Sequence, residues 1–200
     1  MDRIESAYQR IWKTRGARFI AHSNYLAQNK CSNFTVAILS VYIIVLSCYF
    51  ISPTLKAKFN QDELNLVILA ASLLTLVFSQ IESSKDYKLK ADKLHRNAME
   101  LSEIYDEMQS VYFSADPLNV KQSKTDQILN KYNQLVQKCD ENHNSYDYEM
   151  FELRNRKELK IKRNCLEVFV LNIYYYIRIR IYFFLWIITP LLVFALVTMK

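Results

Sequence analysis

Three long apolar runs that contain no charged residue most constrain what this chain can fold into. They cover residues 34–55, 64–81 and 181–199, and none of them contains Asp, Glu, Lys, Arg or His. A helix rises about 1.5 Å per residue, so each run is about long enough to cross a hydrocarbon core roughly 30 Å thick. A soluble domain of 200 residues could not bury three such runs in one core. The sequence therefore predicts a membrane protein.

The scarcity of turn residues predicts an all-α membrane protein. The chain has one glycine and three prolines, too few for a series of β-hairpins. We expect a transmembrane helical hairpin, a long cytoplasmic amphipathic helical hairpin and a third, C-terminal transmembrane helix. The expected segments are a basic cytoplasmic N-terminal helix over 1–33, a transmembrane hairpin over 34–81 with spans at about 34–55 and 64–81, a cytoplasmic helical hairpin over 82–165, and a C-terminal helix over 166–200 with a span at about 181–199.

Basic residues predict the orientation of the spans. They precede the first and third spans and follow the second, whereas the loop over 52–63 balances two lysines with two acidic residues. The positive-inside rule then places the N-terminus and residues 82–180 in the cytoplasm, and the loop outside. We therefore expect a multi-pass membrane protein with its N-terminus in the cytoplasm. Residues 82–180 hold 17 basic and 16 acidic residues, so direct nucleic-acid binding is not expected.

A heptad seam follows the second span. Apolar or small residues alternate at spacings of four and three, and polar residues flank them. The seam consists of Tyr87, Ala91, Leu94, Ala98, Leu101, Tyr105, Met108 and Tyr112. Neither Pro nor Gly separates it from the second span, so the span and this helix are expected to form one continuous rod, which ends before Pro117.

A second seam runs through the rest of the cytoplasmic segment. It consists of Ile128, Tyr132, Leu135, Cys139, Asn142, Tyr146, Met150 and Leu153. Two such helices joined by a loop predict an antiparallel hairpin. The seams can pack within one chain or pair between subunits as a coiled coil, and packing within the chain is favoured because two seams of similar length are available. Asn142 could set the register or be exposed to solvent.

Small hydroxyl residues lie in stripes on the first two spans. Ser72, Thr75 and Ser79 share one helix face, and Ser40 and Ser47 form a shorter stripe on the first span. Such residues usually allow close helix packing. The alternative is that they line a water-filled path in a homo-oligomer.

Two arginines, Arg178 and Arg180, precede the third span. We interpret them as interfacial residues whose charges reach the lipid headgroups at the membrane edge, rather than as charges that sense voltage. Membrane lipid is therefore an expected partner.

No motif predicts an enzyme, a cofactor or a metal site. The chain lacks a phosphate-binding glycine loop, a zinc-protease motif and a nucleophile elbow. The histidines His22, His95 and His143 stand alone, and the four cysteines show no CxxC spacing.

Several short patterns resemble the SLATT superfamily of bacterial conflict-system membrane effectors. Before the first span they are Ile11-Trp12-Lys13-Thr14-Arg15 and Arg18-Phe19; within it, Leu39-Ser40-Val41-Tyr42; and after the second span, Tyr87, Ala91, His95, Asn97-Ala98, Glu100-Leu101 and Tyr105. The resemblance implies a pore-forming or membrane-perturbing effector of antiphage defence and abortive infection, located in the bacterial inner membrane. It also implies a sensor encoded nearby, which would be a reverse transcriptase, a nucleotide second-messenger synthase or a nucleotide-binding protein. The third span goes beyond the two-span core of that superfamily.

Three functions remain open at this point. The first is an effector that oligomerises and breaches the membrane when a sensor is triggered. The second is a non-conducting membrane anchor or scaffold for a cytoplasmic partner. The third, a holin-like lysis protein, fits least well because the cytoplasmic portion is so long.

Overall fold

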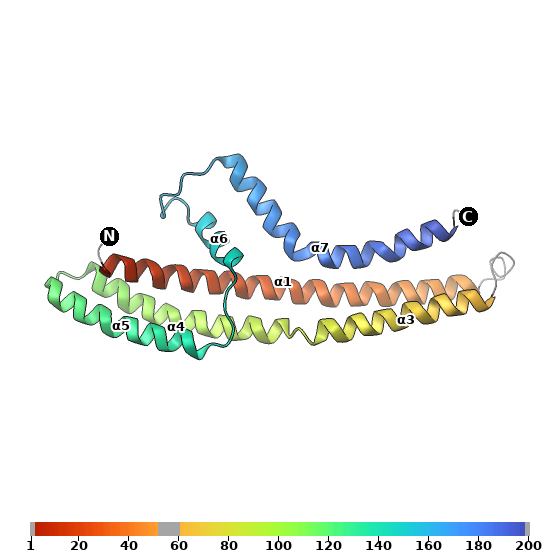
Figure 1. The fold of residues 1–200 in the computed structure, drawn as a ribbon, viewed down its shortest axis with the longest axis horizontal. Helices are drawn as coiled ribbons and strands as arrows, with labels where there is room; N and C mark the ends of the chain where they lie inside the picture. Colours follow the sequence, from red (N-terminus) through yellow and green to blue (C-terminus); the bar gives the residue numbers. More distant parts are fainter. Residues whose placement is uncertain (1–2, 52–60, 199–200) are drawn as a thin grey trace. The chain divides into compact units, whose positions relative to one another are not determined.

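The computed structural model describes residues 3–51 and 61–198, and all the regular secondary structure in them is helical (Figure 1). The helices are α1 (Arg3–Ile51), α3 (Gln61–Ser83), α4 (Tyr87–Phe113), α5 (Leu118–Lys138), α6 (Ser145–Arg154) and α7 (Cys165–Thr198). Three helical stretches are long and apolar enough to cross a membrane. The predicted all-α membrane protein is confirmed. Residues 52–60, which cover the end of the predicted first span and most of the loop after it, lie outside the described residues.

The chain divides into two compact units. Unit 1 comprises Met1–Leu26 and Tyr87–Tyr176, and unit 2 comprises Ala27–Asp86 and Ile177–Lys200. Both α1 and α7 contribute residues to each unit. The basic N-terminal segment and the first span therefore belong to one uninterrupted helix, although they belong to different units.

The core of unit 1 is built from α1, α4 and α5. The predicted hairpin is present, because α4 packs against α5 within the chain and the link between them is short. The N-terminal part of α1 completes the core, which the sequence pattern did not indicate. Its buried residues are Ile4, Ala7 and Ile11 of α1, Leu101, Ile104, Met108 and Val111 of α4, and Ile128 and Tyr132 of α5.

Most residues of the first seam are buried. Among the predicted positions, Ala91, Leu94, Ala98, Leu101 and Met108 are buried, whereas Tyr87, Tyr105 and Tyr112 are half-buried. The buried face is wider than a two-position seam, because Asn97, Ile104 and Val111 are buried too. This width fits a helix that packs against both α1 and α5. Pairing of the seams between subunits stays a prediction.

The second seam is not one helix, which corrects the sequence-based expectation. Its helix ends at Lys138, and α6 begins at Ser145 after an Asn144 N-cap. Asn144 and Asp147 form a capping box, in which each side chain accepts a bond from the other residue's backbone N–H. Ile128, Tyr132, Met150 and Leu153 are buried, Leu135 and Cys139 are half-buried, and Asn142 is exposed.

The predicted continuous rod is also wrong. Helix α3 ends at Ser83, and α4 begins at Tyr87. Asp86, between them, has a φ of 49°. Asp tolerates this left-handed conformation better than most residues, so the chain can turn here without glycine or proline.

A second buried cluster in unit 1 joins α1, α6 and the beginning of α7. It contains Ile20 of α1, Met150, Phe151 and Leu153 of α6, and Tyr175 of α7.

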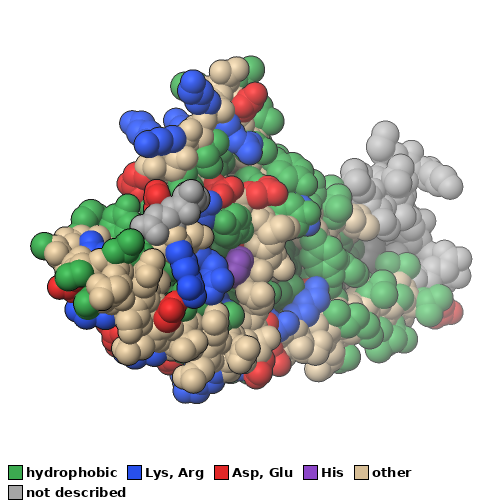
Figure 2. Space-filling view, turned by 60° about the vertical axis from the view of Figure 1, so that its left-hand side comes forward, with side chains coloured by type: hydrophobic (Ala, Val, Ile, Leu, Met, Phe, Trp, Pro, Cys, Tyr) green, Lys and Arg blue, Asp and Glu red, His purple; other side chains and the backbone are tan. Residues whose placement is uncertain are grey.

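The link between α6 and α7 is at the top of Figure 1. Lys and Arg side chains gather at the same height in Figure 2, beside exposed hydrophobic side chains.

Unit 2 holds the apolar spans. Phe78 of α3 is buried, and its ring centroid lies 4.5 Å from that of Trp186 in α7. Most other large apolar side chains of α3 are exposed, among them Leu66, Leu69 and Leu73. Such a surface suits a helix that faces lipid rather than water.

Candidate functional site

Four of the five hydroxyl side chains of the predicted stripes donate hydrogen bonds within their own helices. Ser72 Oγ donates to the Ile68 carbonyl at 2.8 Å, and Thr75 Oγ1 donates to the Ala71 carbonyl at 2.9 Å. On α1, the Ser40 and Ser47 hydroxyls donate in the same way, four residues back, to Val36 and Ile43. Ser72, Thr75, Ser79 and Ser47 are half-buried, and Ser40 is exposed. The four hydroxyl protons that these bonds use are therefore satisfied without a partner helix, and the hydroxyl oxygens retain acceptor capacity.

A different stripe of α1 forms its buried face in unit 2. Ser32, Thr35 and Leu39 are buried, and the Thr35 hydroxyl donates to the Cys31 carbonyl at 2.8 Å. Small residues at this spacing let another helix backbone come close. Sequence reasoning missed this stripe because it begins before the apolar run. The spacing of three and four residues was a signal that could have found it.

A buried charge lies at the end of α3. The side chain of Glu82 is almost wholly buried and forms an ion pair with Lys85. The Lys85 ammonium also lies 4.8 Å from the ring centroid of Tyr182 in α7. One Glu82 oxygen, Oε2, is buried without a hydrogen-bond partner. Removing one partner of this pair would leave an uncompensated buried charge, and the Lys85–Tyr182 contact links the end of α3 to α7 within unit 2.

Unit 1 contains a buried polar cluster around Arg18. This arginine is 1% exposed, and its Nε and Nη1 atoms have no hydrogen-bond partner. Burial lowers the pKa of His143, and the positive charge of Arg18 lowers it further. Burial raises the pKa of Asp147, which accepts a hydrogen bond from the Asn24 amide at 2.6 Å. The cluster therefore disfavours a second positive charge beside Arg18.

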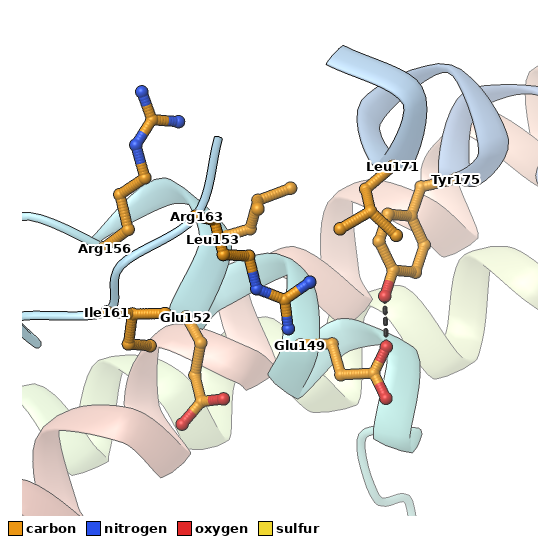
Figure 3. A pocket seen from close by; sticks show the side chains of 8 residues that line it. All are labelled: Glu149, Glu152, Leu153, Arg156, Ile161, Arg163, Leu171 and Tyr175. Carbon is orange, nitrogen blue, oxygen red and sulfur yellow. Dashed lines mark hydrogen bonds between the residues drawn. The ribbon is translucent and has the colours of Figure 1, made fainter. Parts of the chain in front are cut away.

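A small cavity of about 30 Å³ lies between α6 and the start of α7 (Figure 3). The Tyr175 hydroxyl donates a hydrogen bond to Glu149 at its edge. Arg156 and Arg163 also line the cavity, with Glu152 on α6. Its volume is enough for water but not for an organic ligand. The cavity is therefore a gap between two packed elements and not a substrate pocket.

Several residues that carry the family resemblance contact one another in unit 1. The Arg15 guanidinium lies 4.0 Å from the ring centroid of Tyr105, and Phe19 packs edge-on against His95. The Thr14 hydroxyl is 2.9 Å from that of Tyr132. These motif residues therefore fix α1 on α4 and α5.

A stack of three tyrosines joins the same helices. The Tyr8 hydroxyl lies 2.6 Å from that of Tyr105. The Tyr8 ring also stacks on both Tyr105 and Tyr112, at centroid distances of 5.2 and 4.9 Å. The seam pattern treated Tyr105 as an apolar residue and gave no indication of its partner on α1.

The interfacial arginines lie just before the third predicted span. Arg178 is exposed and Arg180 is half-buried. All four cysteines are free thiols. Within residues 3–51 and 61–198, no three His, Cys, Asp or Glu side chains are grouped as metal ligands.

These features define a helical membrane protein with an ordered helical unit outside its spans. The chain belongs to the SMODS and SLOG-associating 2TM effector domain family 5 of the SLATT superfamily, whose family model matches residues 1–196. The predicted superfamily is confirmed, and the effector role follows from it. No curated protein and no solved structure matches the chain.

Proposed function

We propose that this protein is a bacterial inner-membrane effector of antiphage defence, with its N-terminus in the cytoplasm. It oligomerises and opens a pore, or otherwise disrupts the membrane, when a partner sensor is triggered, and the infected cell stops growing. No step requires the protein to catalyse a reaction. The family supports the effector role, and three helical stretches suited to crossing a membrane support the site of action.

The exposed apolar surface of unit 2 is the observation that carries the proposal. Leu66, Leu69 and Leu73 of α3 are exposed, whereas the three hydroxyl residues of the predicted stripe on this helix are half-buried. In lipid, apolar side chains give helices no hydrophobic reason to associate, and small residues that permit close contact decide where they pack. Ser72, Thr75 and Ser79 thus offer the face for packing between copies or for lining a path.

The trigger comes from another protein in this proposal. The family description names association with SMODS and SLOG proteins. We propose a sensor encoded beside this chain, either a nucleotide second-messenger synthase or a reverse transcriptase, and no direct binding of nucleic acid. Unit 1 would receive the signal, because its ordered helices present a polar surface outside the spans.

A triple substitution tests the hydroxyl face. Ser72→Leu, Thr75→Val and Ser79→Leu keep the span apolar, so the variant should still insert. If the face lines a path, membrane depolarisation on triggering or overexpression is lost while the oligomer persists. If the face packs helices, the oligomer content falls, because bulky side chains keep backbones apart. Leu69→Val, Leu73→Val and Leu76→Val, at three exposed positions of the same helix outside the hydroxyl face, form the matched control.

The same measurement separates an effector from an anchor. An anchor would never depolarise the membrane, and it would still recruit its partner after its spans were replaced by an unrelated transmembrane hairpin. A parent protein that leaves the membrane potential unchanged while its sensor is active would overturn the effector proposal.

Cysteine labelling tests the proposed orientation. In a chain whose four native cysteines are replaced by serine, a cysteine at Phe59 should react with an impermeant probe from outside the membrane. A cysteine at Leu118 should react only after the membrane is opened. Labelling of position 59 from the cytoplasmic side alone would show the orientation to be wrong.

A further inference from the structure

Helix α7 is longer than a membrane crossing needs. It runs from Cys165 to Thr198, 34 residues, or roughly 51 Å at 1.5 Å per residue. Arg178 and Arg180 divide it into a first stretch, 165–177, which is largely apolar with Glu167 as its one charged residue, and an uncharged second stretch from residue 181. The second, from residue 181, is about long enough to cross a bilayer, whereas the first, 165–177, would rise only about 20 Å. An apolar helical stretch of that length is typical of a buried or interfacial segment.

Only one side of this first stretch is covered by unit 1. Val168, Leu171 and Tyr175 pack against the α6 cluster, and Tyr175 donates its hydroxyl to Glu149. The opposite side is apolar and exposed: Leu166 is 74% exposed and Phe169 is 62% exposed. Val170, Ile173 and Ile177 continue the exposed side. A contiguous exposed apolar face of this kind marks a surface that binds another protein or a membrane.

A basic turn comes directly before this face. Residues 154–163 contain six Lys or Arg and one Glu. The turn is ordered, because Ile161 N–H donates to the Arg156 carbonyl at 2.9 Å and Lys160 N–H donates to the Lys157 carbonyl at 3.3 Å. Lys160, Lys162 and Arg163 are exposed. A basic segment joined to an apolar helix face is the pattern of proteins that bind the surface of anionic membranes.

We propose that the basic turn and the exposed face of residues 165–177 dock on the anionic headgroup layer of the bilayer and tether unit 1 to the membrane surface. The apolar face ends at Ile177, four residues before the predicted third span begins at residue 181 of the same helix, so its end lies close to the membrane edge. Exposed Tyr174 and Tyr176 suit that interfacial depth. A second copy of the chain is a poorer occupant, because it would bring two strongly basic turns together. The tether depends on membrane insertion and not on pore formation.

Fluorescence quenching in nanodiscs tests the proposal on the full-length chain. The native cysteines are replaced by serine, and a bimane label is attached to a cysteine at Phe169. A label at Leu118, an exposed apolar position of α5 in the same unit, is the matched control. In nanodiscs with phosphatidylglycerol and a doxyl-labelled lipid, the label at position 169 should lose most of its emission. The label at position 118 should be quenched mainly by acrylamide from the water.

Charge reversal tests the role of the basic turn. Lys160→Glu with Lys162→Glu should reduce lipid quenching at position 169 in anionic nanodiscs to the level seen in phosphatidylcholine alone. Arg96→Glu with Lys138→Glu, on α4 and α5, makes the same change in net charge and should leave the quenching as it was. Because both pairs are exposed, neither disturbs a buried contact.

Three outcomes would overturn the proposal. A label at position 169 that acrylamide quenches as well as at position 118 shows a face in water. A label shielded from both acrylamide and lipid shows a face covered by protein, such as a second copy. Equal lipid quenching with and without anionic lipid shows that the basic turn has no part in docking.

Discussion

The ring of Phe151 lies against the backbone of Gly16. A Cβ atom added at Gly16 would lie 1.8 Å from Cε2 of Phe151, which is much closer than two non-bonded carbon atoms can approach. Gly16 is the only glycine in the chain, and it is buried within α1. The contact lets α6 seat its aromatic residue directly on the N-terminal helix, where Trp12 packs edge-on against the same ring.

Replacing Gly16 by Ala should destabilise unit 1. Overpacking against Phe151 costs about 1–3 kcal/mol, and the better helix propensity of alanine returns about 1 kcal/mol. In a Phe151→Ala background the clash is gone, so Gly16→Ala should then raise the free energy of unfolding. Denaturant unfolding of the four variants in one detergent measures both signs. A Gly16→Ala change that stabilises the parent chain would contradict the contact.

Leu101 should matter more for stability than Leu135, although the seam pattern treats them alike. Leu101 is fully buried among α1, α4 and α5, whereas Leu135 is half-buried. We expect Leu101→Ala to lower the free energy of unfolding by about 2–5 kcal/mol. Leu135→Ala should lower it by less, because its cavity opens to solvent. Met99→Ala, at an exposed position of α4, should change it by less than about 0.5 kcal/mol.

His143 should make unit 1 less stable in weak acid. Its pKa in the folded chain lies below the usual 6.5, because of burial and the charge of Arg18. Below pH 6.5 the unfolded chain therefore binds more protons, and the free energy of unfolding falls as the pH drops toward the lowered pKa. The slope stays well under the limit of about 1.4 kcal/mol per pH unit, since His143 is partly solvated.

His143→Gln tests this sign. The variant should lose less stability than the parent between about pH 7.5 and about pH 5.5, the window in which an ordinary histidine titrates. Asp147→Asn should act in the opposite sense. Burial raises the pKa of Asp147, so the parent gains stability from this group as the pH falls toward 3.8, and the variant does not. Identical pH profiles for the parent and His143→Gln would contradict the assignment.

Lys160→Gly should stabilise the basic turn. Lys160 has a φ of 53° and closes a Schellman motif in which Ile161 N–H bonds the Arg156 carbonyl. Glycine normally occupies this position, and relief of the strain should add about 0.5–1 kcal/mol. Lys162→Gly removes the same charge at a residue without positive φ, so it should be neutral or destabilising. Thermal unfolding in a zwitterionic detergent compares the two.

The fold class could be read from the sequence because its signals are local. An uncharged run of membrane length and a seam repeated every seven residues need no knowledge of distant partners. The buried positions of Leu94, Leu101, Met108 and Ile128 follow from that period. The turn at Asp86 and the break after Lys138 could not be read in the same way, because neither contains glycine or proline.

The candidate sites were harder to predict because they depend on contacts between distant residues. In the sequence, Arg18 is one of the basic residues that predict a cytoplasmic N-terminus. It is in fact buried in unit 1 beside His143, more than a hundred residues away in the chain. Glu82 follows the last residue of an apolar run, where a charged side chain is expected to face water. Its side chain is instead buried and forms an ion pair with Lys85. Which side of α7 is exposed in unit 1 follows only from the packing of Val168 and Leu171 on α6.

The tyrosine stack of Tyr8, Tyr105 and Tyr112 gives the protein its own optical reporter. Fixed aromatic rings in close contact produce circular dichroism in the near ultraviolet, whereas helix content is recorded in the far ultraviolet. Should the N-terminal part of α1 leave α4 while both stay helical, the near-ultraviolet band would fade and the far-ultraviolet spectrum would persist. A rearrangement of this unit in intact membranes could therefore be followed without attaching a dye.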